Sequence, residues 1–223
     1  ISQLEAPICA GGSVEIDLDD GSRKPIGITR INMEEDAAKL LHDGDTSIDF
    51  NRCGVPLLEI VSEPDLRSAK EASRFLQKIR QIVTYLGICD GNMEEGSLRC
   101  DANVSVRRRG EQRFGTKTEL KNLNSFRNVE RALEYEIDRQ AGMLFRGETV
   151  APVTLLWDAE RNTAVPMRAK ERSHDYRFFP EPDLLPAVIE ETRISTAVAT
   201  AVEHPTVRRD RFMETYGLSR YDA

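Results

Sequence analysis

Apolar and polar residues alternate along residues 97–107, and this period of two predicts an extended strand with one buried face and one polar face. Its apolar positions are Leu98, Cys100, Ala102, Val104 and Val106, and its polar positions are Ser97, Arg99, Asp101, Asn103, Ser105 and Arg107. Just before this strand, Glu94 and Glu95 stand beside Gly96, where the chain can turn tightly. Carboxylates, an arginine and amides gathered in this way have the chemistry to hold a metal and a phosphate.

A second strand is predicted within residues 115–124, where it can return antiparallel to the first. Lys117, Glu119 and Lys121 share one face of it, so a second polar row is expected beside the first. The turn between the two strands carries Arg107, Arg108, Arg109 and Arg113. We interpret this turn most simply as a solvated hairpin tip, with contact to an RNA backbone as the alternative.

The region before residue 90 contains signals for strands and then for one helix. Residues 13–33 form a predicted hairpin that turns at Asp20 and Gly21, and short strands follow at residues 47–50 and 57–61. Ser68 and Glu71 have the spacing of a capping box at the start of a helix. Apolar residues then recur at helical spacing until Gly87, which is expected to end this helix.

The region after residue 125 predicts one long helix and then shorter elements. An apolar stripe runs along residues 126–146 and predicts an amphipathic helix that stops at Gly147. A hairpin is expected from residues 153–157 and 165–168, and residues 176–179 are a possible edge strand. From Glu190 onward the composition favours short helices punctuated by Pro205 and Gly217.

These elements predict an α+β fold. Neighbouring strands are joined by expected hairpins rather than crossovers, so the sheet should be mostly antiparallel, with helices on one face and the other face open. The central order is strand, helix, strand, strand, helix. We expect one domain over residues 1–190 and the start of a separate helical domain over residues 191–223.

Composition narrows the class of protein. The net charge of −7 over 223 residues argues against a protein that grips nucleic acid with its whole surface. The four cysteines form no CxxC pair, which makes a structural zinc site or a disulfide framework unlikely and favours the cytoplasm. No apolar run reaches the ~18 residues of a membrane span, and there is no signal-peptide pattern, so no membrane partner is expected.

Two acidic positions stand out as metal candidates. Glu59 lies within the apolar run PLLEIV, where a charge needs a cation, a hydrogen-bond donor or a metal nearby. A metal ligand and a structural ion pair are equally good interpretations of this residue. Glu34 and Glu35 end a predicted strand and should point to opposite faces, so only one of them should line a given site. Carboxylates of this kind suit Mg²⁺, which takes one or two of them together with phosphate oxygens.

Phosphate binding would depend on side chains. The sequence has neither GxxxxGK[ST] nor a GxGxxG after a strand, so both common glycine-rich phosphate cradles are missing. Arg99, Lys117 and Lys121 are the candidate phosphate ligands, although Arg99 with Asp101 also fits a simple exposed ion pair. The three histidines fit neither a zinc motif nor a catalytic triad, and His42 is expected in a surface loop.

Five segments carry a family resemblance: INMEEDAAK, DFNRCGVPLLEIVSEPDLRS, DGNMEEGSLRCDANVSVR, FGTKTELKNLNSFRNVERALEYEIDRQ and HDYRFFPEPDL. Together and in this order they strongly resemble the B subunits of the aspartyl/glutamyl-tRNA amidotransferases, almost from end to end of the chain. The resemblance implies a cradle fold with β-α-β-β-α units, similar to glutamine synthetase and the guanidino kinases.

The resemblance also implies an activity. In this family the A subunit, a glutaminase, releases ammonia from glutamine, a small C subunit completes the heterotrimer, and the ammonia travels to the B subunit. There ATP phosphorylates the side-chain carboxylate of Glu-tRNA(Gln) or Asp-tRNA(Asn), and ammonia displaces the phosphate. An acyl phosphate is needed because a carboxylate is a poor electrophile, and its formation requires a metal and cations.

The resemblance assigns roles to particular residues. The Mg²⁺ ligands of the family match Glu35 and Glu59, together with a Glu and a His upstream that this chain lacks. Arg99, Asp101, Asn103, Lys117 and Lys121 are then expected to line the ATP pocket. The family's cysteine-rich zinc site and its tRNA-binding tail domain are also absent.

The ends of the chain suggest a different class of function for the piece in isolation. The chain starts at Ile1 without a methionine and stops at Ala223, so we expect a fragment of a longer protein. Such a fragment should be inactive alone, and the alternative hypothesis is a non-catalytic scaffold that docks the partner proteins and tRNA. A third hypothesis is an ATP-dependent ligase that acts on a small acid without tRNA.

Overall fold

A computed structural model describes residues 6–223 except residues 44, 168–182 and 184, with side chains left out at residues 42–45. The chain divides into two units, Ile1–Ile79 and Arg80–Ala223, and each is described by itself. Both units combine strands with helices, so the predicted α+β class is confirmed. The expected domain boundary at residues 190–191 stays a prediction.

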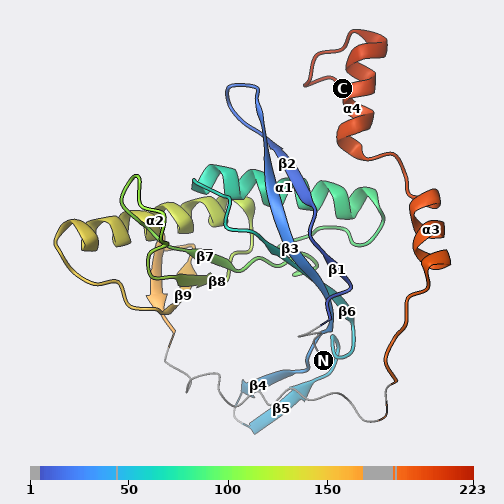
Figure 1. Cartoon of the computed structure of the whole chain (residues 1–223). Coiled ribbons are helices and arrows are strands. Elements are labelled where there is room, and N and C mark those ends of the chain that lie inside the picture. The colour runs from blue at the N-terminus through green and yellow to red at the C-terminus, as the bar shows by residue number, and fades with distance from the viewer. Residues whose placement is uncertain (1–5, 44, 168–182, 184) are drawn as a thin grey trace. The chain divides into compact units, whose positions relative to one another are not determined.

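The first unit is built on a long antiparallel ribbon (Figure 1). Its strands are β1 (Cys9–Ala10), β2 (Ser13–Asp17), β3 (Arg23–Glu35) and β6 (Pro56–Ser62). β3 pairs with β1 and β2 and, further along, with β6. The predicted hairpin is therefore confirmed. Its turn is stabilised by Asp20, whose Oδ1 accepts hydrogen bonds from the backbone N–H and the hydroxyl of Ser22.

A second hairpin, β4 (Lys39–Asp43) and β5 (Asp45–Asp49), lies between β3 and β6 in the sequence. The strand expected at residues 47–50 corresponds to β5, whereas β4 was not predicted. The expectation of a surface loop at His42 was wrong, because this residue belongs to β4. The sequence LLHD has no polar and apolar alternation that would have marked it as a strand.

Helix α1 (Ala69–Tyr85) begins at the predicted capping box. The Ser68 hydroxyl accepts the N–H of Glu71 at 3.1 Å, and the Glu71 carboxylate accepts the N–H of Arg67 at 2.8 Å. Glu71 also binds Nζ of Lys24 on β3 at 2.7 Å, which fixes the start of the helix on the ribbon. The helix gives way to Gly87 in the left-handed region (φ 68°), as the sequence predicts.

The second unit contains a four-stranded sheet in the order β10-β9-β8-β7. Its strands are β7 (Ala102–Val104), β8 (Thr118–Lys121), β9 (Thr154–Asp158) and β10 (Thr163–Pro166). β7 with β8 and β9 with β10 are antiparallel, but β8 and β9 are parallel. The expectation that only hairpins join neighbouring strands was therefore wrong here, because a helix connects β8 to β9 and permits a parallel crossover.

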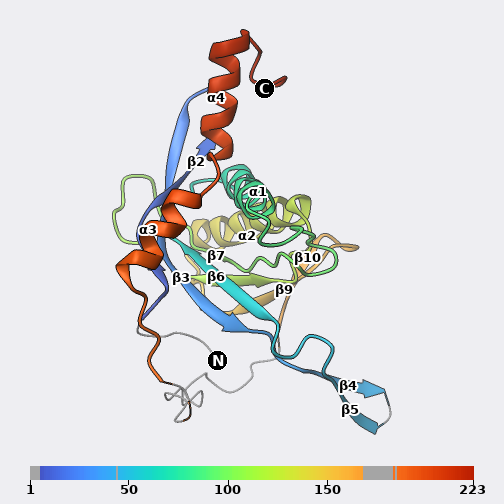
Figure 2. The ribbon, with the colours of Figure 1, turned by 90° about the vertical axis from the view of Figure 1, so that its right-hand side faces the viewer.

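That helix is α2 (Phe126–Phe145), and it packs across one face of the sheet (Figures 1 and 2). Ser125 caps its start by accepting the N–H of Asn128 at 3.1 Å, and Gly147 (φ 76°) follows its end. The core between helix and sheet includes Trp157, whose ring meets Tyr135 edge to face at 6.0 Å. The other core side chains here include Leu120, Val129, Leu133 and Leu155.

The strand predicted over residues 97–107 is regular only at β7. Residues 90–101 run through turns, yet burial still alternates from Ser97 to Val104, with apolar side chains half-buried and polar ones exposed. The two-faced pattern thus correctly predicts orientation, while the length of the strand is overestimated because β8 offers only a short partner.

The end of the described chain holds α3 (Glu191–Thr200) and α4 (Pro205–Tyr216). Pro205 stands in the first turn of α4, and Gly217 follows it with φ 65°, so both predicted punctuation points are confirmed. His204 caps α4, because its Nδ1 accepts the N–H of Thr206 at 3.3 Å. The edge strand expected at residues 176–179 lies outside the described residues, and so does His174, one of the three histidines. No helix in the described part of the chain is long and apolar enough to cross a membrane.

Candidate functional site

In the first unit the candidate ligand Glu59 lies directly opposite Asn32 on the paired strands β6 and β3. Nδ2 of Asn32 donates to the Glu59 carboxylate at 2.9 Å. The apolar neighbours of Glu59 predicted a hydrogen-bond donor beside it, and Asn32 is that donor. The side chain of Glu59 is nevertheless exposed, so burial is not the reason why it has this partner. Asn32 is only 3% exposed, and its Oδ1 has no hydrogen-bond partner among the described residues.

The register of the two strands decides which acid shares a face with Glu59. Glu34 pairs with Leu57 and Glu35 pairs with Pro56, so Glu34 lies on the face of Glu59 and Asn32, and Glu35 lies on the opposite face. Burial agrees, since Glu34 is half-buried and Glu35 is exposed. The structure therefore separates the adjacent acids as the sequence predicts, but it does not bring Glu35 and Glu59 onto one face.

The donor set around Glu59 suits a hard cation. Glu59, Glu34 and Asn32 present carboxylate and amide oxygens, the ligand class that Mg²⁺ takes, and the unpartnered amide oxygen of Asn32 is the atom whose burial calls for a ligand. No group of three or more His, Cys, Asp or Glu within the described ranges is arranged to hold a metal. These residues fit part of a magnesium site, and the remaining ligands would come from elsewhere.

In the second unit the polar residues of β7 and β8 meet as predicted. Asn103 pairs with Glu119 across the strands, and Nζ of Lys121 contacts the carboxylate of Asp101 at 2.9 Å and that of Glu119 at 3.6 Å. Thr154 on β9 donates its hydroxyl to Glu119 at 2.9 Å, which extends the polar row to a third strand. This face points away from α2, since the alternate residues Thr118 and Leu120 are the buried ones.

The charge of Lys121 is held firmly. Partial burial alone would lower the pKa of its ammonium, but the hydrogen bond and charge of Asp101 and the charge of Glu119 outweigh it, and the pKa is raised. Asp101 forms an ion pair with Lys121. The Nε of Arg99 donates a hydrogen bond to the carbonyl of Gly96 at 3.2 Å. Lys117 is exposed at the start of this row.

Glu94 and Glu95 form an exposed acidic turn. Oδ1 of Asn92 accepts the backbone N–H groups of both residues, at 3.0 and 3.3 Å, and both side chains are exposed. Among the described residues, no hydrogen bond or ion pair joins either side chain to the polar row, so the simpler interpretation of this pair fits.

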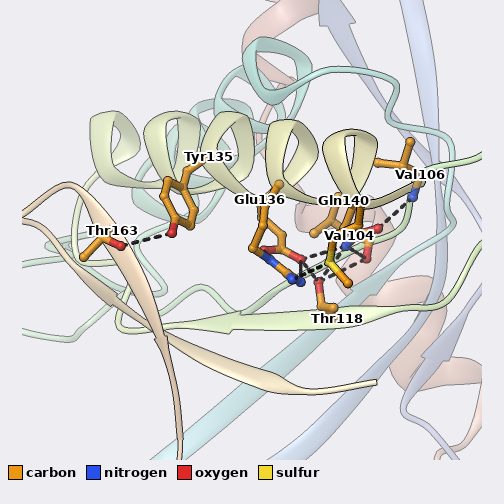
Figure 3. Close-up of polar contacts among 9 residues, drawn as sticks. Val104, Val106, Thr118, Tyr135, Glu136, Gln140 and Thr163 are labelled. Atoms are coloured by element: carbon orange, nitrogen blue, oxygen red, sulfur yellow. Dashed lines mark hydrogen bonds and ion pairs between the residues drawn. The ribbon is translucent and has the colours of Figure 1, made fainter. Parts of the chain in front are cut away.

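A buried polar cluster on α2 was not predicted from the sequence (Figure 3). The side chain of Glu136 is completely buried and accepts hydrogen bonds from Thr118 on β8 at 2.9 Å and from Gln140 at 2.9 Å. Arg139 binds the same carboxylate through two nitrogens, at 2.6 and 2.7 Å. Gln140 also accepts the N–H of Val106, just after β7, at 3.0 Å and donates to the carbonyl of Val104 on β7 at 3.3 Å, so the cluster ties α2 to both strands that carry the polar row.

The cluster keeps Glu136 ionised. Burial by itself would raise the pKa of this carboxyl, but the hydrogen bonds from Arg139, Gln140 and Thr118 outweigh burial and lower the pKa. A signal for it exists in the sequence, because Glu136 and Gln140 lie three and seven residues after Leu133 on the apolar stripe. Two polar residues on a buried helix face imply partners across the interface.

Within the part of the chain that the structure describes, no cysteine belongs to a group of three or more His, Cys, Asp or Glu that could hold a metal. Cys9, Cys53, Cys89 and Cys100 are all free thiols. Burial, with a smaller effect of the Asp101 charge, raises the pKa of the Cys100 thiol to about 12. This thiol is therefore protonated near neutral pH and acts as a packing residue.

Comparison with known proteins gives a family and several relatives. Residues 1–195 match the family described as the GatB/GatE catalytic domain. The whole chain is 57% identical to the B subunit of the aspartyl/glutamyl-tRNA(Asn/Gln) amidotransferase of Alkalilimnicola ehrlichii and covers 47% of that protein. It is 57% identical to the same protein of Chlorobium phaeobacteroides, with 47% covered, and 56% identical to that of Salinibacter ruber, with 46% covered.

The chain thus spans about half the length of the curated relatives that it matches. The match runs through both units, and it includes β3, β6, β7 and β8, the strands that carry the candidate residues. The chain belongs to the GatB/GatE catalytic domain family.

Proposed function

We propose that this chain is the catalytic part of an amidotransferase B subunit, which activates the side-chain carboxylate of Glu-tRNA(Gln) or Asp-tRNA(Asn) with ATP and then forms the amide. The observation that supports this most strongly is the family match over residues 1–195, together with an oxygen-donor face around Glu59 inside that match. In the reaction, a carboxylate oxygen of the substrate attacks the γ-phosphorus of ATP and ADP leaves. Ammonia then attacks the carbonyl carbon of the acyl phosphate, loses a proton and expels phosphate.

The residues of the first unit would supply ligands for a divalent cation. Bound Mg²⁺ would neutralise charge on the transferring phosphoryl group. Asn32 orients Glu59, because its Nδ2 donates a hydrogen bond to the Glu59 carboxylate. Its Oδ1, which has no hydrogen-bond partner among the described residues, would be a further oxygen ligand for the cation. For the second carboxylate the family resemblance favours Glu35, whereas the strand register favours Glu34. Separate substitution of each decides between them.

The polar row of the second unit would bind phosphate groups of ATP. Lys121 keeps its positive charge because of Asp101 and Glu119, and Arg99 and Lys117 add cations on the same expected face. Asn103 contributes a side-chain amide opposite Glu119. Side-chain binding of this kind replaces the glycine-rich loops that the sequence lacks.

The proposed setting is a heterotrimer with a glutaminase, the A subunit, and a small C subunit. The word "subunit" in the names of the relatives supports such partners. We further propose that the fold is a cradle with β-α-β-β-α units, similar to that of glutamine synthetase and the guanidino kinases, and that the protein acts in the cytoplasm, where its four free thiols are stable.

The test uses the full-length B subunit in complex with its partners. Glu59→Gln is compared with Glu63→Gln, a matched exposed carboxylate just beyond the end of β6. Amide formation on aminoacyl-tRNA is measured with ammonium chloride as well as with glutamine, because added ammonia bypasses the glutaminase step. Glu59→Gln should lose at least about 100-fold in rate with either nitrogen source, as expected when a metal ligand is removed from a phosphoryl-transfer site.

Three outcomes are informative. Loss in Glu59→Gln with normal activity in Glu63→Gln supports the proposal. Normal activity in Glu59→Gln contradicts the role of this face. Activity that falls with glutamine but not with ammonium chloride would move the defect to ammonia delivery and would also contradict the role given to Glu59.

A further inference from the structure

The turn that joins β7 to β8 is a cationic projection on an acidic chain. Residues 107–113 include four arginines and one acid, Glu111, whereas the whole chain carries a net charge of −7. Arg108, Arg109 and Arg113 are exposed. A local cluster of positive charges can attract a polyanion even when the net charge of the chain is negative. The reason is that salt screens charges that are more than about 10 Å away at 0.1 M ionic strength.

Within the part of the chain that the structure describes, these three arginines have no carboxylate partner. Among the described residues, no ion pair or hydrogen bond involves the side chain of Arg108, Arg109 or Arg113. Elsewhere in the same unit arginines do pair, as Arg146 does with Glu148 at 2.6 Å. The cationic groups of the turn are therefore available to an outside anion.

The turn is also built to hold a shape. The guanidinium of Arg107 lies 4.7 Å from the ring centre of Phe114 and donates to the carbonyl of Gln112 at 2.6 Å, which links the two sides of the turn. At Gly115 a Cβ atom would come within 2.1 Å of the carbonyl oxygen of Val106, so only glycine fits there.

The base of the turn is fixed to the core of the second unit. The N–H of Val106 donates to Gln140, which belongs to the buried cluster around Glu136 (Figure 3). A fixed base loses less conformational entropy on binding than a loose loop does. The arginines therefore project from a defined support.

We propose that this turn, residues 107–114, contacts the phosphate backbone of the tRNA, and this inference rests on the proposed function. Guanidinium groups match phosphate geometry, and Phe114, which is 51% exposed, adds an aromatic surface beside them. Arginines interleaved with an exposed aromatic ring are typical of nucleic-acid contacts. An acidic face of a partner protein would need no such ring, so we favour RNA.

The test compares two double variants of the full-length B subunit in the assembled enzyme. R108A/R109A removes two charges from the turn, and R127A/R161A removes two exposed arginines elsewhere in the same unit. The KM for aminoacyl-tRNA is measured between 50 and about 200 mM salt. For R108A/R109A we expect a KM increase of roughly 5- to 30-fold at low salt. The salt slope, which is the slope of log KM against the logarithm of the salt concentration, should be smaller by about 1.5, since each lost phosphate contact lowers this slope by ~0.7–0.9.

Other readouts separate this role from misfolding and from assembly. In R108A/R109A, kcat at saturating tRNA, glutaminase activity and the size of the complex should equal those of the wild type. R108K/R109K should recover most of the salt slope because it restores the charge. R127A/R161A should leave KM and slope unchanged.

Two results would overturn the inference. If KM and the salt slope are unchanged in R108A/R109A, this turn does not contact the RNA. If the complex dissociates in this variant, the turn binds a protein partner instead. If the wild-type enzyme forms no amide on tRNA, the proposed function fails by itself, so the two failures are distinguishable.

Discussion

Replacing Glu136 tests whether the buried cluster holds α2 on the second sheet. Glu136→Ala removes the carboxylate that accepts two hydrogen bonds from Arg139 and one each from Thr118 and Gln140. Breaking a buried ion pair by deleting one partner costs about 3–5 kcal/mol. Arg139 is 32% exposed, so water can solvate the remaining charge, and the lower end of that range is expected.

The expected loss in the free energy of unfolding is therefore about 3 kcal/mol for Glu136→Ala. Glu136→Gln should lose less, about 1.5–2 kcal/mol, because the amide oxygen can still accept from Thr118 and Gln140 while the charged contact with Arg139 is lost. Glu134→Ala is the matched control on the exposed side of α2 and should change stability by less than about 0.5 kcal/mol.

Urea unfolding at 25 °C measures these values through the fluorescence of Trp157, the one tryptophan of the chain, which is 1% exposed in the same unit. The free energy of unfolding is expected to fall by about 2 kcal/mol for each mole per litre of urea, so Glu136→Ala should lower the urea concentration at the midpoint of unfolding by ~1.5 M. A midpoint equal to that of Glu134→Ala would refute the reasoning, because it would mean that the four hydrogen bonds contribute nothing net.

The pH dependence has a defined sign. The pKa of Glu136 is lowered in the folded state from an ordinary value of 4.5, so its stabilising contribution is complete above pH 4.5 and is lost as the pH falls through the lower folded value. The stability gap between wild type and Glu136→Gln should be constant from pH 6 to 8 and should shrink in more acidic solution. A gap that widens in acid would contradict the direction of the shift.

Three further predictions concern local features. Ser125→Ala removes the cap of α2 and should cost about 1 kcal/mol in urea unfolding, whereas Ser125→Asp should retain stability; equal stability of Ser125→Ala and wild type would contradict the capping role. Cys100, with a pKa of about 12, should react with iodoacetamide at pH 8 far more slowly than exposed Cys9, as mass spectrometry of the labelled peptides would show; equal rates would contradict its burial. Gly115→Ala should destabilise the β7–β8 turn by more than about 2 kcal/mol in urea unfolding, because its Cβ would meet the Val106 carbonyl. Gly110→Ala meets no atom within 4 Å, and only the backbone strain of its φ of 92° opposes it, so it should cost less than Gly115→Ala.

Local sequence signals predicted most of the fold. The capping box at Ser68, the apolar stripe of residues 126–146 and the glycines after both helices are local signals, and both helices begin and end close to where these signals indicate. The hairpin around Asp20 follows the same logic. The parallel pairing of β8 with β9 could not be read in this way, because it depends on how α2 packs across the sheet.

The site was predicted less completely than the fold. Alternation predicted that Lys121 and Glu119 share a face, and pairing across strands then brought Asp101 to Lys121. Register cannot be derived from one strand alone, so the placement of Glu34 rather than Glu35 beside Glu59 needed the β3–β6 pairing. The Glu136 cluster was missed, although Arg139 and Gln140 lie within about one turn of Glu136 on α2, because the burial of this helix face depends on packing against β8, which contributes Thr118.

If the face of β3 and β6 around Glu59 binds the divalent cation of phosphoryl transfer, as we propose, substitutions on this face should change the response of the enzyme to magnesium. In the assembled full-length enzyme, tRNA-dependent ATP cleavage is followed as Mg²⁺ is raised, for wild type and for Glu59→Gln, Glu34→Gln and Glu35→Gln. The Mg²⁺ concentration for half-maximal rate should rise by at least about tenfold in Glu59→Gln and in one of the other two variants. An unchanged half-maximal concentration in Glu59→Gln would contradict the proposal.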